Sequence, residues 1–361
     1  MSGTSLDGVD AVLVDFSDNK PALIESYSHP IPDKLKEELL DTIQPSWQGS
    51  LLNIGTLDQK LGKLFADAVN QLLKLTPIDK SQIKAIGSHG QTLWHQPTGE
   101  HPFSLQLGNA NIISELTAIT TVADFRGRDI AASGQGAPLV PAFHAQYLTH
   151  PTRNRIILNI GGIANITFLP STDNHSSQVS GFDTGPGNGL IDAWIKSHTE
   201  KSYDHSGQWA KSGNILPDLL EDLLDDPYFS TPPPKSTGKE YFNLHWLHKK
   251  LNSKFSACAT KDIQATLTAL TAYTIAKHCN NCDEILICGG GVHNKYLIEL
   301  LEQYLKNKPT ILSTESAGID PDWMEAIAFA WLAKQTLENK PGNLPMVTGA
   351  KGSRILGAIY Q

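Results

Sequence analysis

The chain has 361 residues, which is more than one compact core usually contains, so two domains are expected. Its hydrophobic fraction of 40% and charged fraction of 18% are those of a globular protein and exclude a disordered or fibrous chain. The net charge of −8 forces no basic face and therefore argues against a nucleic-acid partner.

The amino-terminal residues do not form a signal peptide, because they lack a basic region and their apolar run 11–14 ends at Asp15. No stretch of the chain reaches the ~20 apolar residues of a membrane span. We therefore expect a cytoplasmic protein without a membrane partner.

The predicted elements alternate between strand and helix. A turn of Gly, Ser and Thr leads into a strand that ends near residue 16, and an apolar stripe at helical spacing covers 57–75. The later elements expected, in chain order, are a strand at 83–88, a helix at 111–116, strands at 119–123 and 156–160, helices at 190–195 and from 263, a strand at 284–288, a helix at 296–305, a strand at 310–313 and a helix at 321–337 capped by Asp320. This alternation predicts an α/β fold.

Two β-hairpins with small residues at their tips, 1–16 and 155–169, each open a run of alternating elements. Duplicated halves that face one another would place the two tips across a cleft. A repeat this short also arises by chance, so it supports the architecture without proving it.

A proline-rich excursion covers 225–240. It is either an exposed surface loop without a role in a site or a loop that lines a cleft. Cys279 and Cys282 form one C-x-x-C pair with His278 and Cys288 nearby, so a metal site is conceivable. Reduced cysteines around a helix end and a buried strand are the favoured interpretation.

Two glycine-rich segments, 2–8 and 161–165, are candidates for binding phosphate, because small residues let backbone N–H groups approach an anion. Either segment alone is better explained as an ordinary turn. Their occurrence together makes phosphate binding and plain turns about equally favoured. A third segment, 289–291, follows a buried strand, where ligands gather in α/β sheets.

Asp183 lies in the segment G-F-D-T-G-P-G-N, where three glycines and a proline surround one carboxylate. We favour a functional role: the carboxylate would orient Mg²⁺ or act as a general base. The alternative is an Asp that caps the following helix.

Arg126 and Arg128 either clamp an anion or form ion pairs with Asp124 and Asp129. For Arg128 the two alternatives are about equally favoured, whereas for Arg126 we favour binding of an anionic ligand. Glu325 lies near a helix start. From the sequence alone, a carboxylate that interacts with the helix dipole is a better explanation for it than an acid that lines a cleft. The histidines are mostly expected to be structural or solvated because they lack metal-ligand spacing; those considered are His89, His95, His101, His144 and His293.

Taken together, the motifs resemble the anhydro-N-acetylmuramic acid kinases. The matching segments, in the family's order and across nearly the whole chain, are MSGTSLDGVD, SHGQTLWHQP, ADFRGRDIAASGQGAPLVPAFH, NIGGIANIT, GFDTGPGN, CGGGVHN, MEAIAFAWLA and TGAKGSRILGAIY. The resemblance implies an actin/hexokinase-like fold made of two ribonuclease H-like domains with ATP between them. We place the first domain at 1–130 plus 341–361 and the second, with nucleotide-binding elements, at 131–340.

The same resemblance implies a reaction. The family's enzymes use ATP and water to open 1,6-anhydro-N-acetylmuramic acid and to phosphorylate the released O6, which gives N-acetylmuramic acid 6-phosphate and ADP in cell-wall recycling. Asp183 would be the base that deprotonates water. The developing charge on O6 is taken up by phosphorus, so no second carboxylic acid is required, unlike in a glycosidase.

Ligand-binding residues carry over in the same way. ATP phosphates and nucleoside would be held by Gly3, Thr4, Ser5, Leu6, Asp7, Gly8, Val9, Asp10, Gly161, Gly162, Asn165, Gly289, Gly290 and Gly291. The candidates for sugar contacts are Thr92, Arg126 and Glu325. Mg²⁺ would keep most of its water, so few protein ligands are expected. The oligomeric state stays open between a monomer and a homodimer.

Two departures from the family pattern stand out. A strand normally precedes M-S-G-T-S, whereas Met1 stands where that strand should end; either residues are missing upstream or the first sheet lacks a strand. Ser133 stands where the family more often has Gly.

Two other functions remain open at this point. One is a kinase of the same superfamily that acts on another substrate. The other is a binding protein that ATP switches between two conformations. The G-F-D-T-G-P-G-N and F-R-G-R-D segments argue against the first, and the absence of an obvious peptide-binding extension argues against the second.

Overall fold

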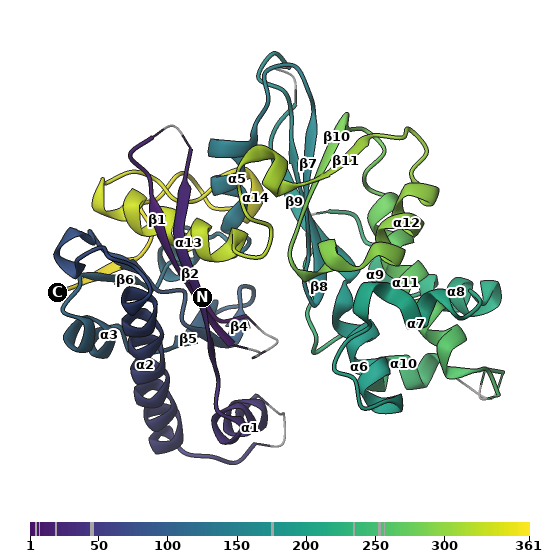
Figure 1. The fold of residues 1–361 in the computed structure, drawn as a ribbon, viewed down its shortest axis with the longest axis horizontal. Helices are drawn as coiled ribbons and strands as arrows, with labels where there is room; N and C mark the ends of the chain where they lie inside the picture. The colour runs from purple at the N-terminus through teal and green to yellow at the C-terminus, as the bar shows by residue number, and fades with distance from the viewer. Residues whose placement is uncertain are drawn as a thin grey trace. The chain divides into compact units, whose positions relative to one another are not determined.

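The computed structural model describes residues 1–3, 6, 8–18, 20–43, 47–174, 177–233, 235–251, 254–255 and 257–361. The chain packs as two compact units, one formed by Met1–Tyr147 with Trp323–Gln361 and the other by Leu148–Asp322. Figure 1 shows the elements of each unit along the chain. The first unit is discontinuous in sequence, whereas the second is a single continuous stretch.

The elements of unit 1 are β1 (Gly8–Asp15), β2 (Ala22–Pro30), α1 (Asp33–Thr42), α2 (Leu51–Lys74), β3 (Ile86–Gly87), β4 (Gln91–Gln96), β5 (Phe103–Leu107), α3 (Ala110–Thr117), β6 (Thr121–Ala123), α4 (Gly127–Ala131), α5 (Val140–Leu148, at the boundary), α13 (Met324–Leu337), α14 (Pro345–Thr348) and β12 (Ala358–Tyr360). Those of unit 2 are β7 (Arg155–Ile160), β8 (Ile163–Leu169), β9 (Ser180–Pro186), α6 (Asn188–His198), α7 (Gln208–Lys211), α8 (Pro217–Leu224), α9 (Pro227–Ser230), α10 (Leu244–Lys250), α11 (Thr260–Ala276), β10 (Glu284–Cys288), α12 (Lys295–Tyr304) and β11 (Thr310–Ser313).

Unit 2 is built on a five-stranded sheet with the order β11-β10-β7-β8-β9. Strands β7, β10 and β11 are parallel, while β8 is antiparallel to both β7 and β9. Strand β10 is buried at every position, as expected for a strand covered on both faces. This strand order agrees with the ribonuclease H-like domain expected for this part of the chain.

Helix α11 is the centre of unit 2. Its side chains are buried nearly all round, because it packs against β8 and β9 and against the neighbouring helices α6, α8 and α12. Such a helix carries apolar and small residues on every face rather than on one stripe. One apolar cluster joins α11 and α12 to the sheet, and another joins α11 to α6, α8 and α10.

Unit 1 has smaller sheets. Strands β1 and β2 form one antiparallel pair, β4 and β5 form another, and β12-β6-β3 make a three-stranded sheet. The apolar stripe of α2 covers β1 and β2, and α13 packs on β1 and β3. The core here gathers Leu6, Val9, Leu39, Leu61 and Ile113.

The predicted α/β class is confirmed, and most predicted elements are present. The helix expected from residue 321 is wrong at its start: α13 begins at Met324, because Asp320 accepts from the N–H of Asp322 at 2.9 Å and caps a preceding turn. Of the strand expected at 83–88, only Ile86–Gly87 form a strand, which is β3.

The units divide the chain at 147/148 and 322/323, whereas the predicted domain boundaries lie at 130/131 and 340/341. The difference is that α5 and α13 belong with unit 1, where α13 packs on β1 and β3. The subdivision into two ribonuclease H-like domains at the predicted boundaries stays a prediction. Within the described part of the chain, no helix combines the length and apolar character that crossing a membrane requires.

Candidate functional site

Three of the predicted segments in unit 2 lie at one edge of its sheet. Strand β9 runs in the same direction as β7 and β10, because β7 and β9 both flank the antiparallel β8. The carboxyl ends of β7, β9 and β10 therefore meet at the same edge. The glycine segments 161–162, 185–189 and 289–291 directly follow or end these strands, which is where ligands bind in open α/β sheets.

The tip between β7 and β8 is tied to the start of α6. The carbonyl of Gly162 accepts from the N–H groups of Gly187 and Gly189, both at 3.0 Å, and the carbonyl of Gly161 accepts from Asn188 at 2.8 Å. These are N–H groups that a helix start otherwise leaves unpaired. The segment G-P-G-N-G thus fixes the β7–β8 tip and the helix start as one rigid piece.

Close approach explains why glycine is needed here. A Cβ atom on Gly189 would lie 2.7 Å from the carbonyl oxygen of Gly162, and one on Gly187 would lie 3.0 Å from the carbonyl carbon of Ile163. Real Cβ atoms essentially never come within 3.0 Å of such backbone atoms. By contrast, a Cβ on Gly161 would meet nothing closer than 3.7 Å, so there is open space beside this residue, although its N–H already donates to Ile163 O at 3.2 Å.

The glycines after β10 have different roles. Gly289 has a positive φ of 77°, donates its N–H to Pro321 at 2.8 Å and lies against Ile160 of β7. Gly291 is buried against the same residue. Only Gly290 is exposed, and a Cβ there would have nothing closer than the Asn188 amide at 4.0 Å. Gly161 and Gly290 therefore leave space for the close approach of a phosphate or nucleoside.

Asp183 is held by the excursion that follows α9. Its Oδ2 accepts from the N–H of Thr237 at 2.9 Å, its own N–H donates to Lys235 O at 3.1 Å, and its carbonyl accepts from Tyr228 Oη at 2.7 Å. The residue before α6 is Gly187, and no side chain caps that helix. The carboxylate is thus positioned by 235–237 rather than used as a helix cap.

The surroundings of Asp183 favour its neutral form. The pKa of this carboxyl is raised from 3.8 to about 6, mainly by burial and to a smaller extent by the neighbouring Glu240 carboxylate, while the Thr237 N–H acts in the opposite direction. A carboxyl with a pKa near 6 is close to the value at which a general base is most effective at neutral pH.

Two more residues lie close to this carboxylate or to the β7–β8 tip. Asn165 of β8 is the direct cross-strand neighbour of Asp183, so their side chains share one face of the sheet. Lys239 lies over the tip, since a Cβ on Gly162 would come 2.5 Å from its Cε. The proline-rich excursion, whose role the sequence left open, therefore lines this edge of unit 2.

In unit 1, Arg126 is buried and bound on two sides. Its Nη1 donates to the carbonyl of Gly136 at 2.7 Å, and its Nη2 lies 2.7 Å from Nε2 of His89. Burial lowers the pKa of the guanidinium to about 10, and the carboxylate of Glu325 acts in the opposite direction. Its Nε is buried and has no hydrogen-bond partner among the described residues.

His89 is held as a neutral acceptor. Arginine can only donate, so Nε2 of His89 accepts, and Nδ1 carries the proton that it donates to Gly90 O at 2.7 Å. Burial, followed by the charge of Arg126, lowers the pKa of His89 well below its usual value. Burial and Arg126 also lower the pKa of His95 to about 4.

The other candidates for sugar contacts also belong to unit 1. Glu325 is half-buried in the first turn of α13, where its charge is felt by Arg126. Thr92, on β4, accepts through its Oγ1 from Gln106 Nε2 at 3.2 Å. The structure brings Glu325 and Arg126 into electrostatic range of each other and shows no such link for Thr92.

The first glycine-rich segment lies partly outside the described residues, which exclude Thr4, Ser5 and Asp7. Leu6 and Val9 are buried in the core of unit 1, so their side chains cannot meet ATP and only their backbone could. The remaining predicted members, Gly3, Gly8 and Asp10, are at least partly exposed. Asp10 accepts from Ser28 Oγ at 3.1 Å.

The alternatives for Arg128 and for the cysteines can be compared with the structure. Asp129 is fully buried and accepts from Gly136, Asn343 and Thr348, so it connects loops and does not pair with Arg128. Cys279 and Cys282 are free thiols whose pKa values burial raises. Among the described residues, no cluster of His, Cys, Asp and Glu could hold a metal ion.

Several residues of this geometry were missed from the sequence. Thr237, Tyr228 and Lys239 lie far from Asp183 in sequence and act largely through backbone or hydroxyl groups, so no motif signals them. His89 was expected to be structural or solvated. Its place in S-H-G-Q-T, before a strand and beside a buried arginine, is visible only in three dimensions.

The family model and the curated relatives agree over the full length of the chain. A family model described as "Anhydro-N-acetylmuramic acid kinase" matches residues 1–361. Curated proteins of that name from Coxiella burnetii and Saccharophagus degradans are 53% and 51% identical, covering 100% of this chain and 96% and 97% of theirs. Among solved structures, the activator of 2-hydroxyisocaproyl-CoA dehydratase from Clostridium difficile with bound ADPNP matches with a TM-score of 0.44 at 12% identity, over 92% of this chain and 98% of that one.

Proposed function

The chain belongs to the anhydro-N-acetylmuramic acid kinase family, and from this premise we propose that it converts 1,6-anhydro-N-acetylmuramic acid, ATP and water to N-acetylmuramic acid 6-phosphate and ADP. It is a sugar kinase of cell-wall recycling. The assignment of residues rests on Asp183, a carboxyl with a pKa of about 6 that Thr237 holds on strand β9 of the five-stranded sheet.

Asp183 is the general base in this proposal. It takes a proton from the water that attacks C1, and the C1–O6 bond breaks as the new C1–O bond forms. The electron pair stays on O6, which attacks the γ-phosphorus of ATP, and the bond from that phosphorus to ADP breaks. The proton on Asp183 is then released to solvent, so one proton leaves per turnover.

ATP and sugar are assigned to different residues. The open space beside Gly161 and Gly290 supports contacts with phosphate and nucleoside, with Asn165, Gly162, Gly289 and Gly291 shaping the same edge. Gly3 to Asp10 remain proposed phosphate contacts. Arg126, Glu325 and Thr92 remain proposed sugar contacts.

Mg²⁺ is the proposed metal, and it would neutralise charge on the transferring phosphate when bound with ATP. The described residues hold no ready-made cluster of carboxylates for it. In this proposal the nucleotide phosphates and water would supply most of the metal's ligands. Because the reaction consumes ATP, we assign it to the cytoplasm.

The direct test is turnover with defined substrates. With Mg²⁺-ATP and 1,6-anhydro-N-acetylmuramic acid, we expect ADP release that depends on the sugar. In water enriched with ¹⁸O, the label should appear in the sugar product and not in its phosphate group, because water attacks C1 and O6 attacks phosphorus. Mass spectrometry of the product distinguishes the two positions.

The outcomes separate this function from the other two. Absence of sugar-dependent ADP release would refute the assignment. Turnover with a different sugar alone would favour a kinase of another specificity. ATP binding or hydrolysis without any sugar acceptor would favour a nucleotide-switched binding protein.

A further inference from the structure

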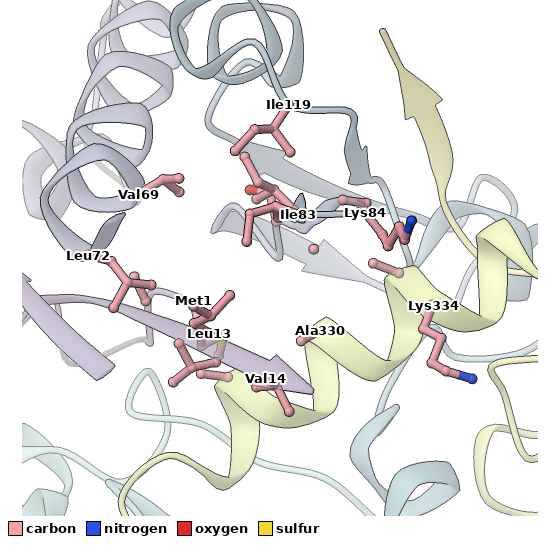
Figure 2. Close-up of a pocket in the computed structure, with 18 of the residues that line it drawn as sticks. Met1, Leu13, Val14, Val69, Leu72, Ile83, Lys84, Ile119, Ala330 and Lys334 are labelled. Carbon is pink, nitrogen blue, oxygen red and sulfur yellow. The ribbon is translucent and has the colours of Figure 1, made fainter. Parts of the chain in front are cut away.

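Unit 1 contains a cavity of about 850 Å³, which is shown in Figure 2. Met1, Leu72 of α2 and Ala330 of α13 line it, and most of the side chains drawn there are aliphatic. Fixing a polar substrate requires converging polar groups, which an aliphatic lining does not supply. Two charged side chains that the proposed mechanism leaves unused lie in unit 2 instead, where Lys235 and Lys277 contact α9.

Lys235, Tyr228 and Asp183 form a closed ring of hydrogen bonds. The Lys235 ammonium donates to Tyr228 O at 3.1 Å, and the Tyr228 hydroxyl donates to Asp183 O at 2.7 Å. The Asp183 N–H in turn donates to Lys235 O at 3.1 Å. Two positions after Lys235, the Thr237 N–H donates to the carboxylate of Asp183 at 2.9 Å. The segment that carries this N–H therefore begins at a member of the ring.

The side chain of Lys235 is buried against Tyr228. It is 9% exposed, and its ammonium lies 4.6 Å from the centre of the Tyr228 ring, which is a cation–π distance. Burial lowers the pKa of Lys235, and so does its charged neighbour Lys277, a second cation. In the described part of the chain, no carboxylate acts on this pKa in the opposite direction. A buried cation is costly without a counter-charge, so its hold on Tyr228 calls for a reason beyond stability.

The main chain of Tyr228 is fixed from its other side by Asp226. This buried carboxylate accepts from the Tyr228 N–H at 3.0 Å, from Tyr241 Oη at 2.8 Å and from Trp246 Nε1 at 2.8 Å. Tyr228 is thus bound independently of Lys235. Loss of the lysine bond would leave Tyr228 in place and release the segment that follows Lys235.

We propose that Lys235 is a positioning residue, whose ammonium anchors the segment 235–237 to the fixed Tyr228. The anchored segment presents the Thr237 N–H to Oδ2 of Asp183, which leaves Oδ1 to take a proton from the attacking water. Among the described residues, no group donates to Oδ1. Because Asp183 is the proposed general base, this role depends on the proposed function.

The alternative is that Lys235 only stabilises the end of α9. Lys277 has that simpler role: its ammonium donates at 3.0 Å to Phe229 O, the carbonyl that follows Tyr228 O. Lysine side chains commonly bind the last carbonyls of a helix in this way. Lys277 directly follows α11 and is not a member of the ring. It is therefore a matched control, with the same charge and the same type of bond but no link to Thr237.

Lys235→Met and Lys277→Met are compared with the parent chain. Both lose an ammonium and a bond to α9, but only Lys235→Met should free the Thr237 N–H. Losing a bond that favours the carboxylate raises the pKa of Asp183, by about one pH unit in Lys235→Met. Lys277→Met should leave this pKa unchanged. Carbon-13 NMR of protein labelled at the Asp carboxyl carbons measures the pKa without any substrate, and Asp183→Asn identifies the signal.

Steady-state kinetics separate positioning from stability. In Lys235→Met, kcat should fall at least about tenfold, because the base is no longer held in its productive orientation. KM for ATP should stay within about twofold, since the ring is not a proposed ATP contact. The acid limb of kcat/KM should move up by about one pH unit. Lys235→Arg keeps a cation that can donate to Tyr228 O and should recover most of kcat and the position of the limb.

Tyr228→Phe provides a second route into the ring if Lys235→Met does not fold. It removes only the hydroxyl that binds Asp183 O, and it should raise the pKa of Asp183 in the same direction. The proposal is overturned if this pKa is unchanged in the folded ring variants, or if Lys277→Met raises it equally. A pKa that rises in the NMR titration while the kinetic limb stays in place would refute Asp183 as the base and leave the anchoring by Lys235 standing.

Discussion

Asp183 shows how one residue can be both held in place and kept reactive. The Thr237 N–H fixes one carboxylate oxygen at 2.9 Å, while burial and Glu240 oppose the charge that this contact favours. The net result is a pKa of about 6 instead of 3.8. This balance gives a base that is ionised at neutral pH and still accepts a proton readily.

The pKa of Asp183 predicts an acid limb in the pH profile. The base form exists above the folded-state pKa and is lost as pH falls through it, so kcat/KM should decline about tenfold per pH unit below about 6. Steady-state kinetics between pH 4.5 and 8.5 measure this limb. A profile that stays flat down to pH 4.5 would contradict the assignment of Asp183 as base.

The matched variant is Asp183→Asn, which keeps the acceptor for Thr237 but cannot take a proton. It should lose at least about 10²-fold in turnover. Nucleotide binding should be retained, because the carboxylate is not a proposed ATP contact. The unfolding midpoint at pH 8 should be unchanged or higher, since a charge in unfavourable surroundings is removed. Near-normal turnover would show that the base lies elsewhere.

His89 offers a second prediction at this scale, on stability. His89→Leu removes the acceptor of a buried Arg126 N–H and should cost about 1–3 kcal/mol, the usual effect of an unsatisfied buried donor. His89→Gln supplies a side-chain oxygen in a similar place and should recover much of that loss. Urea unfolding of the parent protein and of both variants measures their free energies of unfolding. A Leu variant as stable as the parent would argue against a structural role for this bond.

At the scale of elements, the start of α6 is determined by its contact with the β7–β8 tip. Three N–H groups of residues 187–189 donate to the carbonyls of Gly161 and Gly162. Glycine lowers helix stability where there is room for a side chain. Here there is none, so a glycine-rich helix start is the stable choice.

Gly189→Ala tests this contact. Its Cβ would lie 2.7 Å from Gly162 O, so the backbone must shift, and a loss of about 1–3 kcal/mol is expected. The control is Gly55→Ala in α2, an exposed position where a Cβ meets nothing within 4 Å. That change should instead stabilise by about 0.5–1 kcal/mol. Chemical unfolding measures both, and a stabilised Gly189→Ala would disprove the tight contact.

The elements also show what a sequence can and cannot predict. The periodicity of α2 and the apolar runs of β7 and β10 were sufficient to predict those elements, because burial imposes their patterns. The start of α13 was missed, since Asp320 caps a turn as readily as a helix. The Thr237 contact with Asp183 could not be predicted, because it joins a backbone N–H to a carboxylate 54 positions away.

For the whole molecule, the continuity of unit 2 predicts independent folding. Residues 148–322 contain a complete five-stranded sheet and two apolar clusters. This fragment alone should unfold cooperatively. Residues 1–147 alone lack β12, which pairs with β6, and α13, which packs on β1 and β3, and should not. Circular dichroism during thermal unfolding checks both, and a cooperative 1–147 fragment would contradict the expectation.

At this scale, the membership of helices in one compact unit or the other is the hardest feature to predict from sequence. Glycine motifs mark strand ends and helix starts, and these were found from the sequence. Membership of α5 and α13 in unit 1 depends on packing between residues distant in the chain, which no local pattern reports. The α/β class was predictable because alternating periodicities reflect layer order.

The buried position of the Met1 amino group has a practical consequence. Burial lowers its pKa to about 6, and it donates to Asp10 O inside unit 1. A hydrophilic purification tag fused directly to Met1 would thus be forced against apolar side chains, whereas Gln361 at the other terminus is exposed. Recombinant protein intended for crystallisation is better tagged at its carboxyl end.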